Sequence, residues 1–87
     1  MMREKVVIYS SRWCPFCMRA LTLLNSKEVA FTEIDVDKNP QERVKMREMA
    51  GRNSVPQIWI GDHHVGGCDE LFALERSGEL DQLLARN

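Results

Sequence analysis

Long apolar runs are missing from this sequence. Its apolar stretches, such as Val6 to Tyr9, are far shorter than the roughly 20 residues that cross a bilayer, and the N-terminus has no apolar region typical of a secretory signal. We therefore expect a cytoplasmic protein with no membrane partner. Repeats, linkers and low-complexity tracts are also missing, so the 87 residues predict one compact domain, spanning residues 1–87, with one functional site.

The chain also has no large excess of positive or negative charge, and it has only three cysteines. The 12 lysines and arginines nearly balance 13 aspartates and glutamates, which excludes the broad basic surface of a duplex-binding protein but leaves room for a local cationic pocket. We expect no nucleic-acid partner. The three cysteines are an odd number, unsuited to a fully paired secreted scaffold, and they favour a reducing compartment.

The first half of the chain has the pattern of a strand, a helix and a second strand. Lys5 to Ser10 indicates a buried strand, and Pro15 begins a helix that ends near Lys27. Such a unit usually has parallel strands joined by a right-handed crossover. The apolar residues that define the helix and the second strand are Cys17, Ala20, Leu21, Leu24, Phe31, Ile34 and Val36.

The second half begins with a helix-start signal. We expect Asn39 to be the N-cap acceptor, Pro40 the first helical residue, Glu42 to reach back to the cap, and Gly51 to end the helix. The remaining predicted elements are a strand from Val55 to Ile60, a tight turn at Gly61-Asp62, a strand from His63 to Val65, a helix from Cys68 to Arg76 and a short helix around Leu80, Leu83 and Leu84.

Cys14 and Cys17 form a C-x-x-C pair between a predicted strand and a helix start, which is the setting of a redox motif. Only a thiolate attacks a disulfide, and unpaired N–H groups at the helix N-terminus would stabilise one at Cys14. The helix dipole contributes at most about 2 kcal/mol, so we expect backbone amides, the Cys17 thiol and Arg12 to add to it. Cys17 lies inside the helix, keeps a higher pKa and serves as the resolving thiol.

A structural role is the alternative for this cysteine pair, either as two small buried hydrophobic residues or as half of a zinc site. Zinc needs four ligands, and His63, His64 and Cys68 provide no second pair at zinc-finger spacing. We therefore expect no metal, and we expect the two histidines at the hairpin turn to be solvated.

Three segments together resemble the signature segments of bacterial dithiol glutaredoxins: Cys14-Pro15-Phe16-Cys17, Ser54-Val55-Pro56-Gln57-Ile58-Trp59-Ile60 and Gly66-Gly67-Cys68-Asp69-Glu70-Leu71. The resemblance covers nearly the whole chain. It implies an α/β, thioredoxin-like fold, with a four-stranded mixed sheet in the order βαβ-α-ββ-α flanked by helices. It also implies glutathione as the reductant and disulfide-containing or glutathionylated proteins as partners of a monomer.

The same resemblance implies a glutathione site. In the family the bond before the residue matching Pro56 is cis, which exposes the Val55 backbone to the cysteine part of glutathione. Gly67 would allow close approach, and the amides of Cys68 and Asp69 would hold the γ-glutamyl carboxylate. Without the resemblance, Pro56 indicates a strand start, Gly67 a turn and Cys68 a core residue. The full implied set is Arg12, Phe16, Arg43, Ser54, Val55, Pro56, Gly67, Cys68, Asp69 and Glu70.

Three positions depart from the family pattern. Phe16 stands where tyrosine is usual, so the hydroxyl is lost. Ser11 stands where the family has a lysine, which leaves Arg12 or Arg43 as the cation for the glycine carboxylate of glutathione. Glu70 replaces the aspartate that meets the α-amino group, and its longer arm would reach with looser geometry.

These patterns favour a glutathione-dependent thiol–disulfide oxidoreductase. Cys14 would attack a mixed disulfide and be released by a second glutathione, while Cys17 would complete a dithiol cycle on protein disulfides. Two alternatives remain: a redoxin supplied by thioredoxin reductase, and a carrier that holds an iron–sulfur cluster between two subunits through Cys14 and glutathione. Pro15 and the bulky Trp13 disfavour the carrier, because cluster-binding relatives tend to have small residues there.

Overall fold

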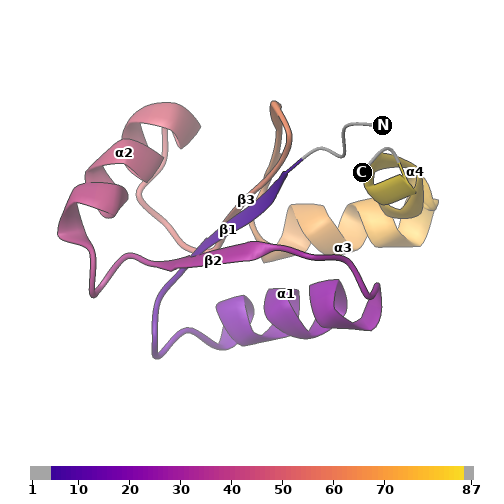
Figure 1. The fold of residues 1–87 in the computed structure, drawn as a ribbon, viewed down its shortest axis with the longest axis horizontal. Coiled ribbons are helices and arrows are strands. Elements are labelled where there is room, and N and C mark those ends of the chain that lie inside the picture. Colours follow the sequence, from indigo (N-terminus) through magenta and orange to yellow (C-terminus); the bar gives the residue numbers. More distant parts are fainter. Residues whose placement is uncertain (1–4, 86–87) are drawn as a thin grey trace.

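The computed structural model describes residues 5–85 and places a four-stranded sheet between helices (Figure 1). β1 pairs in parallel with β2 and antiparallel with β3, and β3 pairs antiparallel with β4. The strand order across the sheet is β2-β1-β3-β4, so the predicted mixed sheet is confirmed. In chain order the elements are β1 Val6–Ser10, α1 Pro15–Ser26, β2 Thr32–Asp35, α2 Pro40–Ala50, β3 Gln57–Ile60, β4 His63–Gly66, α3 Cys68–Ser77 and α4 Glu79–Ala85.

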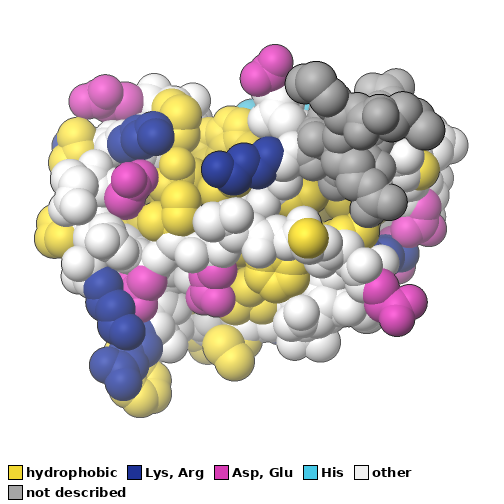
Figure 2. Space-filling view, viewed as in Figure 1, with side chains coloured by type: hydrophobic (Ala, Val, Ile, Leu, Met, Phe, Trp, Pro, Cys, Tyr) yellow, Lys and Arg dark blue, Asp and Glu magenta, His cyan; other side chains and the backbone are white. Residues whose placement is uncertain are grey.

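Helices cover the two faces of the sheet unequally. The larger core packs β1, β3 and β4 against α1, α3 and α4, while α2 packs alone on the opposite face (Figure 1). Along β1, Val6 and Ile8 enter the larger core and Val7 and Tyr9 the smaller one. This alternation explains the unbroken apolar run, because a strand covered on both faces has no polar side. Hydrophobic side chains remain at the surface on the face shown in Figure 2, among charged ones.

The third strand starts later than its apolar pattern predicts. β3 begins at Gln57 rather than at Val55, and the peptide bond between Val55 and Pro56 is cis. Proline has no N–H to donate to the sheet ladder, so pairing begins only after it. The two residues are left as a connecting segment beside the N-terminus of α1, where Val55 O meets the Cys14 side chain.

The predicted capping of α2 is wrong in its side chains. Pro40 begins the helix and Gly51 ends it in a left-handed conformation, with φ of 72°, as expected. However, the Asn39 side chain caps nothing: its Nδ2 donates to Asp35 O at 3.0 Å. Glu42 Oε2 is buried without a hydrogen-bond partner among the described residues. The turn at Asp35 draws the asparagine away from the helix, since it offers an acceptor one turn earlier.

Among residues 5–85, no helix is long and apolar enough to cross a bilayer.

Candidate active site

Cys14 is the N-cap residue of α1. Its backbone is extended, with φ −117° and ψ 105°, and its Sγ accepts the N–H of Cys17 at 3.2 Å. Pro15 follows as the first helical residue, as the sequence predicts. The sulfur thus occupies the position where a helix presents otherwise unpaired N–H groups and the positive end of its dipole. This placement favours negative charge on the Cys14 sulfur.

Cys17 lies one turn further along the helix, with only 1% of its surface exposed. Burial, followed by the hydrogen bond with Cys14, raises the pKa of the Cys17 thiol to about 12. This confirms the expected high pKa of Cys17, because an apolar environment penalises its thiolate. All three cysteines are free thiols in the structure. The Cys14 thiol is partly exposed, and the Cys17 thiol, one helical turn away, is buried.

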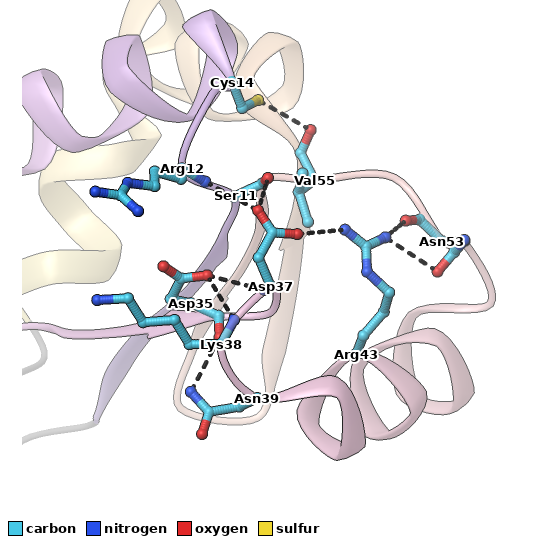
Figure 3. A network of polar contacts seen from close by, with 10 residues as sticks. All are labelled: Ser11, Arg12, Cys14, Asp35, Asp37, Lys38, Asn39, Arg43, Asn53 and Val55. Atoms are coloured by element: carbon cyan, nitrogen blue, oxygen red, sulfur yellow. Dashed lines mark hydrogen bonds and ion pairs between the residues drawn. The ribbon is translucent and has the colours of Figure 1, made fainter.

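The connecting segment before β3 supplies the second wall of the site. Cys14 Sγ lies 3.7 Å from Val55 O, and this carbonyl belongs to the cis peptide bond with Pro56 (Figure 3). Residues 52–56 lie outside the sheet ladder, and backbone groups outside a ladder can pair with a bound chain as an added strand does. A peptide-like ligand on this segment would therefore run directly past the Cys14 sulfur.

A pocket of about 190 Å³ opens beside the cysteine pair. Eight of the residues that the resemblance assigns to glutathione line it, together with one that it does not assign, Arg52. Neither Arg12 nor Arg43 is part of the lining. The lining residues are Phe16, Arg52, Ser54, Val55, Pro56, Gly67, Cys68, Asp69 and Glu70.

Arg52 is a pocket residue that sequence reasoning missed. Its Nη2 lies 3.6 Å from Glu70 Oε1 and donates to Gln57 Oε1 at 3.5 Å. No local pattern marks it, because a lone arginine after a helix end is usually a solvated charge. The structure makes it a cation of the pocket wall, where it favours an anionic ligand.

The opposite end of the pocket is the N-terminus of α3. Gly67 is its N-cap, and Glu70 Oε1 accepts the Gly67 N–H at 2.5 Å. Gly66 has φ of 111°, and a Cβ there would lie only 2.7 Å from Glu70 Oε1. The thiol of Cys68, at the first helical position, is buried, and this burial raises its pKa. The backbone amides at the start of α3 and the Glu70 carboxylate therefore form a polar end wall.

The two arginines expected to be cation candidates are engaged elsewhere. Arg43 Nη1 donates to Asn53 O at 3.0 Å, and its Nη2 lies 3.8 Å from Asp37 Oδ1. The Arg12 guanidinium lies 5.8 Å from the ring centroid of Trp13. The Trp13 side chain is itself 87% exposed, so it does not pack into the fold.

His64 differs from the expectation that both turn histidines are solvated. Its ring stacks on Trp59 at 4.5 Å between centroids, and its Nε2 lies 2.7 Å from Gln57 Oε1. Burial lowers the pKa of His64, so the neutral ring is favoured at neutral pH. Within the described part of the chain, no three His, Cys, Asp or Glu side chains group as metal ligands.

Comparisons with known proteins show which family this chain resembles in sequence and fold. The family model described as Glutaredoxin matches residues 6–65. A curated relative from Pseudomonas aeruginosa, named Glutaredoxin, is 56% identical over 80 residues, which cover 92% of this chain and 95% of the relative. The solution structure of glutaredoxin from Brucella melitensis is 51% identical with a TM-score of 0.83, covering 94% of this chain and 89% of that one. The crystal structure of a buckwheat glutaredoxin–glutathione complex is 26% identical with a TM-score of 0.87, covering 94% and 77%.

Proposed function

This chain belongs to the glutaredoxin family, and from that membership we propose that it reduces disulfides with glutathione through Cys14. It is a thiol–disulfide oxidoreductase with a thioredoxin-like fold. The observation that carries the proposal is the position of the Cys14 sulfur, on the Cys17 N–H at 3.2 Å and 3.7 Å from Val55 O. One sulfur thus faces both a helix N-terminus and the wall of a pocket.

The proposed cycle on glutathionylated proteins uses one thiol of the chain. The Cys14 thiolate attacks the glutathione sulfur of the mixed disulfide, forming a disulfide between Cys14 and glutathione and expelling the substrate thiolate. The thiolate of a second glutathione then attacks the bound glutathione sulfur, releasing oxidised glutathione and regenerating Cys14. On a protein disulfide, the Cys14 thiolate attacks one sulfur, forms a mixed disulfide with the substrate and expels the other sulfur as a thiolate. Cys17 then gives its proton to this thiolate and attacks the Cys14 sulfur, which expels the second substrate thiolate. The resulting disulfide between Cys14 and Cys17 is reduced by two molecules of glutathione.

The pocket chemistry suits a tripeptide with two carboxylates. We assign the cysteine part of glutathione to the Val55 backbone and the γ-glutamyl carboxylate to the Cys68 and Asp69 amides, which open α3. Arg52 adds a positive charge to the pocket wall and is proposed as a further contact of the anionic ligand. The proposed contact surface for glutathione is completed by Phe16, Ser54, Pro56 and Gly67. Glu70 is placed near the α-amino group of glutathione. The relative from buckwheat was crystallised with glutathione.

The compartment follows from the same chemistry. Regeneration of Cys14 needs a pool of reduced glutathione, and such a pool keeps thiols reduced in the cytoplasm. We therefore propose a cytoplasmic site of action.

The choice of reductant is tested by turnover of a glutathionylated peptide under two regimes. Glutathione with glutathione reductase is expected to sustain turnover, and thioredoxin reductase with NADPH is expected to give none. Turnover with thioredoxin reductase and NADPH in the absence of glutathione would identify the chain as a redoxin supplied by thioredoxin reductase. A visible absorption band after anaerobic iron and sulfide reconstitution would instead support the cluster carrier.

Gly66→Ala is expected to weaken glutathione use as well as stability. The new Cβ would press against Glu70 Oε1 and lie 3.0 Å from Arg52 Nη2, so both pocket groups must move. We expect the KM for glutathionylated peptide to rise about tenfold, equivalent to about 1.4 kcal/mol, and stability to fall by roughly 1 to 3 kcal/mol because φ is positive.

Gly78→Ala is the matched control for this variant. Gly78 has φ of 82° but open space around its missing Cβ, so it carries a similar backbone penalty far from the pocket. Urea unfolding should therefore show losses for both variants, whereas steady-state kinetics should show the KM change for Gly66→Ala alone. Equal KM values in the two variants would contradict the assigned pocket.

A further inference from the structure

Asp37 lies between the two segments that form the active site, although it belongs to neither. It follows β2 and precedes α2, and its two carboxylate oxygens face in different directions (Figure 3). One oxygen is turned to the loop that carries Cys14, and the other to Arg43 on α2. The carboxylate is about half exposed. Its contacts are with the loop before Cys14 and with Arg43, which binds the segment before Val55.

The first arm reaches the Cys14 loop. Asp37 Oδ2 accepts the Ser11 hydroxyl at 2.5 Å and the Arg12 N–H at 3.3 Å. These two residues occupy the turn between the end of β1 and Cys14. Hydrogen bonds to an ionised carboxylate are among the stronger ones in proteins, so this arm fixes where α1 begins relative to the sheet.

The second arm reaches the segment that carries Val55. Asp37 Oδ1 lies 3.8 Å from Arg43 Nη2, and Arg43 Nη1 donates to Asn53 O at 3.0 Å and to Asn53 Oδ1 at 3.4 Å. Asn53 stands two residues before Val55, whose carbonyl lies 3.7 Å from Cys14 Sγ. The arginine therefore connects the carboxylate to the backbone of the opposite wall.

Asp37 is itself held in place by a local turn. Asp35 Oδ1 accepts the backbone N–H of Asp37 at 2.8 Å and that of Lys38 at 3.2 Å. The Ser11 hydrogen bond, the Arg12 N–H and the Arg43 charge lower the pKa of the Asp37 carboxyl, so the group is ionised throughout the neutral range. A fixed, charged acceptor is thus available to both arms at once.

We propose that Asp37 is a positioning residue that aligns the Cys14 sulfur with the Val55 segment through these two arms. The inference rests on the proposed function, because alignment matters only if a disulfide bound along Val55 is attacked by Cys14. Attack requires the Cys14 sulfur to touch the sulfur that it attacks and to lie in line with the S–S bond that breaks. A displacement of about 1 Å can lower the rate of such a step about a hundredfold. The contact of Cys14 Sγ with the Cys17 N–H lies within α1 and does not depend on Asp37.

The test compares two reactions of the same sulfur in Asp37→Ala. Reduction of a glutathionylated peptide needs alignment, and we expect its kcat/KM to fall about 10-fold to 100-fold. Alkylation of Cys14 by iodoacetamide needs no Val55 wall, so its rate should be little changed. Asp37→Asn retains an oxygen for Ser11 and Arg12 but loses the charge opposite Arg43, and it should lie between Asp37→Ala and the unmodified protein.

A mutant cycle examines the coupling of the arms. Ser11→Ala and Arg43→Gln should each lower kcat/KM, and neither should lower it further in an Asp37→Ala background, because both act through the same carboxylate. Asp62→Asn, in the turn between β3 and β4, makes the same charge change far from these arms and should leave both reactions unchanged. Circular dichroism confirms that each variant is folded at the assay temperature.

The outcomes separate this inference from the proposed function. Unchanged peptide reduction by Asp37→Ala, with Cys14→Ser inactive, overturns the positioning role and leaves the function standing. Equal losses in peptide reduction and in alkylation also overturn it, since the carboxylate would then act on the thiol itself. An active Cys14→Ser variant contradicts the proposed function instead.

Discussion

Cys14→Ser is expected to lower glutathione-dependent reduction of a glutathionylated peptide by at least about a thousandfold. The serine hydroxyl would occupy the N-cap position and could accept the same Cys17 N–H, since serine is a favourable N-cap residue. Folding should therefore be preserved. The loss would arise because a hydroxyl ionises far less than a thiol and forms no disulfide. Initial rates with the glutathione reductase couple measure it.

Cys17→Ser is the companion variant with the opposite outcome for this substrate. The proposed one-thiol route uses only Cys14, so deglutathionylation should continue, whereas reduction of a protein disulfide should fall sharply for want of the resolving thiol. Serine places a hydroxyl in a site that is 1% exposed, so thermal unfolding must accompany the assay. A folded but inactive Cys17→Ser protein would argue against the one-thiol route.

Local patterns were sufficient for the type and order of the helices and strands and for the cysteine pair, although not for the start of β3. The apolar run in β1, the helical spacing in α1 and the glycine that ends α2 depend on residues close in sequence. The strand order across the sheet needed the family resemblance, because periodicity says which residues are buried but not which strands are neighbours. The cis bond before Pro56 likewise came from the resemblance alone.

The side chains around the site could not be predicted in the same way. Arg52 joins the pocket only because the segment after α2 passes the start of α3, bringing Arg52 Nη2 3.6 Å from Glu70 Oε1. Arg43 is turned toward Asp37 and Asn53, and Asn39 bonds to Asp35 instead of capping α2. The contacts of Arg52 and Arg43 come from tertiary packing, and the Asn39 bond comes from the local turn at Asp35. Apolar periodicity and capping signals do not show where these polar groups point.

Alkylation of the reduced protein at pH 7 is expected to modify Cys14 at least about a thousandfold faster than Cys17. With its pKa raised to about 12, Cys17 holds only about one part in 10⁵ as thiolate at pH 7. Even an ordinary cysteine is a few per cent thiolate there. Access should widen the difference, because Cys17 is only 1% exposed while Cys14 is partly exposed.

The raised pKa of Cys17 also makes the stability of the reduced protein depend on pH. Because folding raises the pKa of Cys17 above its ordinary value, its contribution to stability is fully present below pH 9 and is lost as pH rises toward 12. The difference in unfolding free energy between the reduced protein and Cys17→Ala should therefore shrink over that range. If the difference in unfolding free energy stayed constant from pH 9 to 12, folding would not raise the pKa of Cys17.

The proposed activity depends on one reactive sulfur beside a glutathione pocket. Its most direct test is mass-spectrometric mapping of iodoacetamide adducts on the reduced protein at pH 7, repeated after pretreatment of Cys17→Ser with oxidised glutathione. We predict rapid modification of Cys14 in the first sample, with Cys17 and the buried Cys68 left free, and glutathione on Cys14 blocking it in the second. Modification of Cys17 or Cys68 ahead of Cys14, or a Cys14 that oxidised glutathione leaves unprotected, would contradict the account.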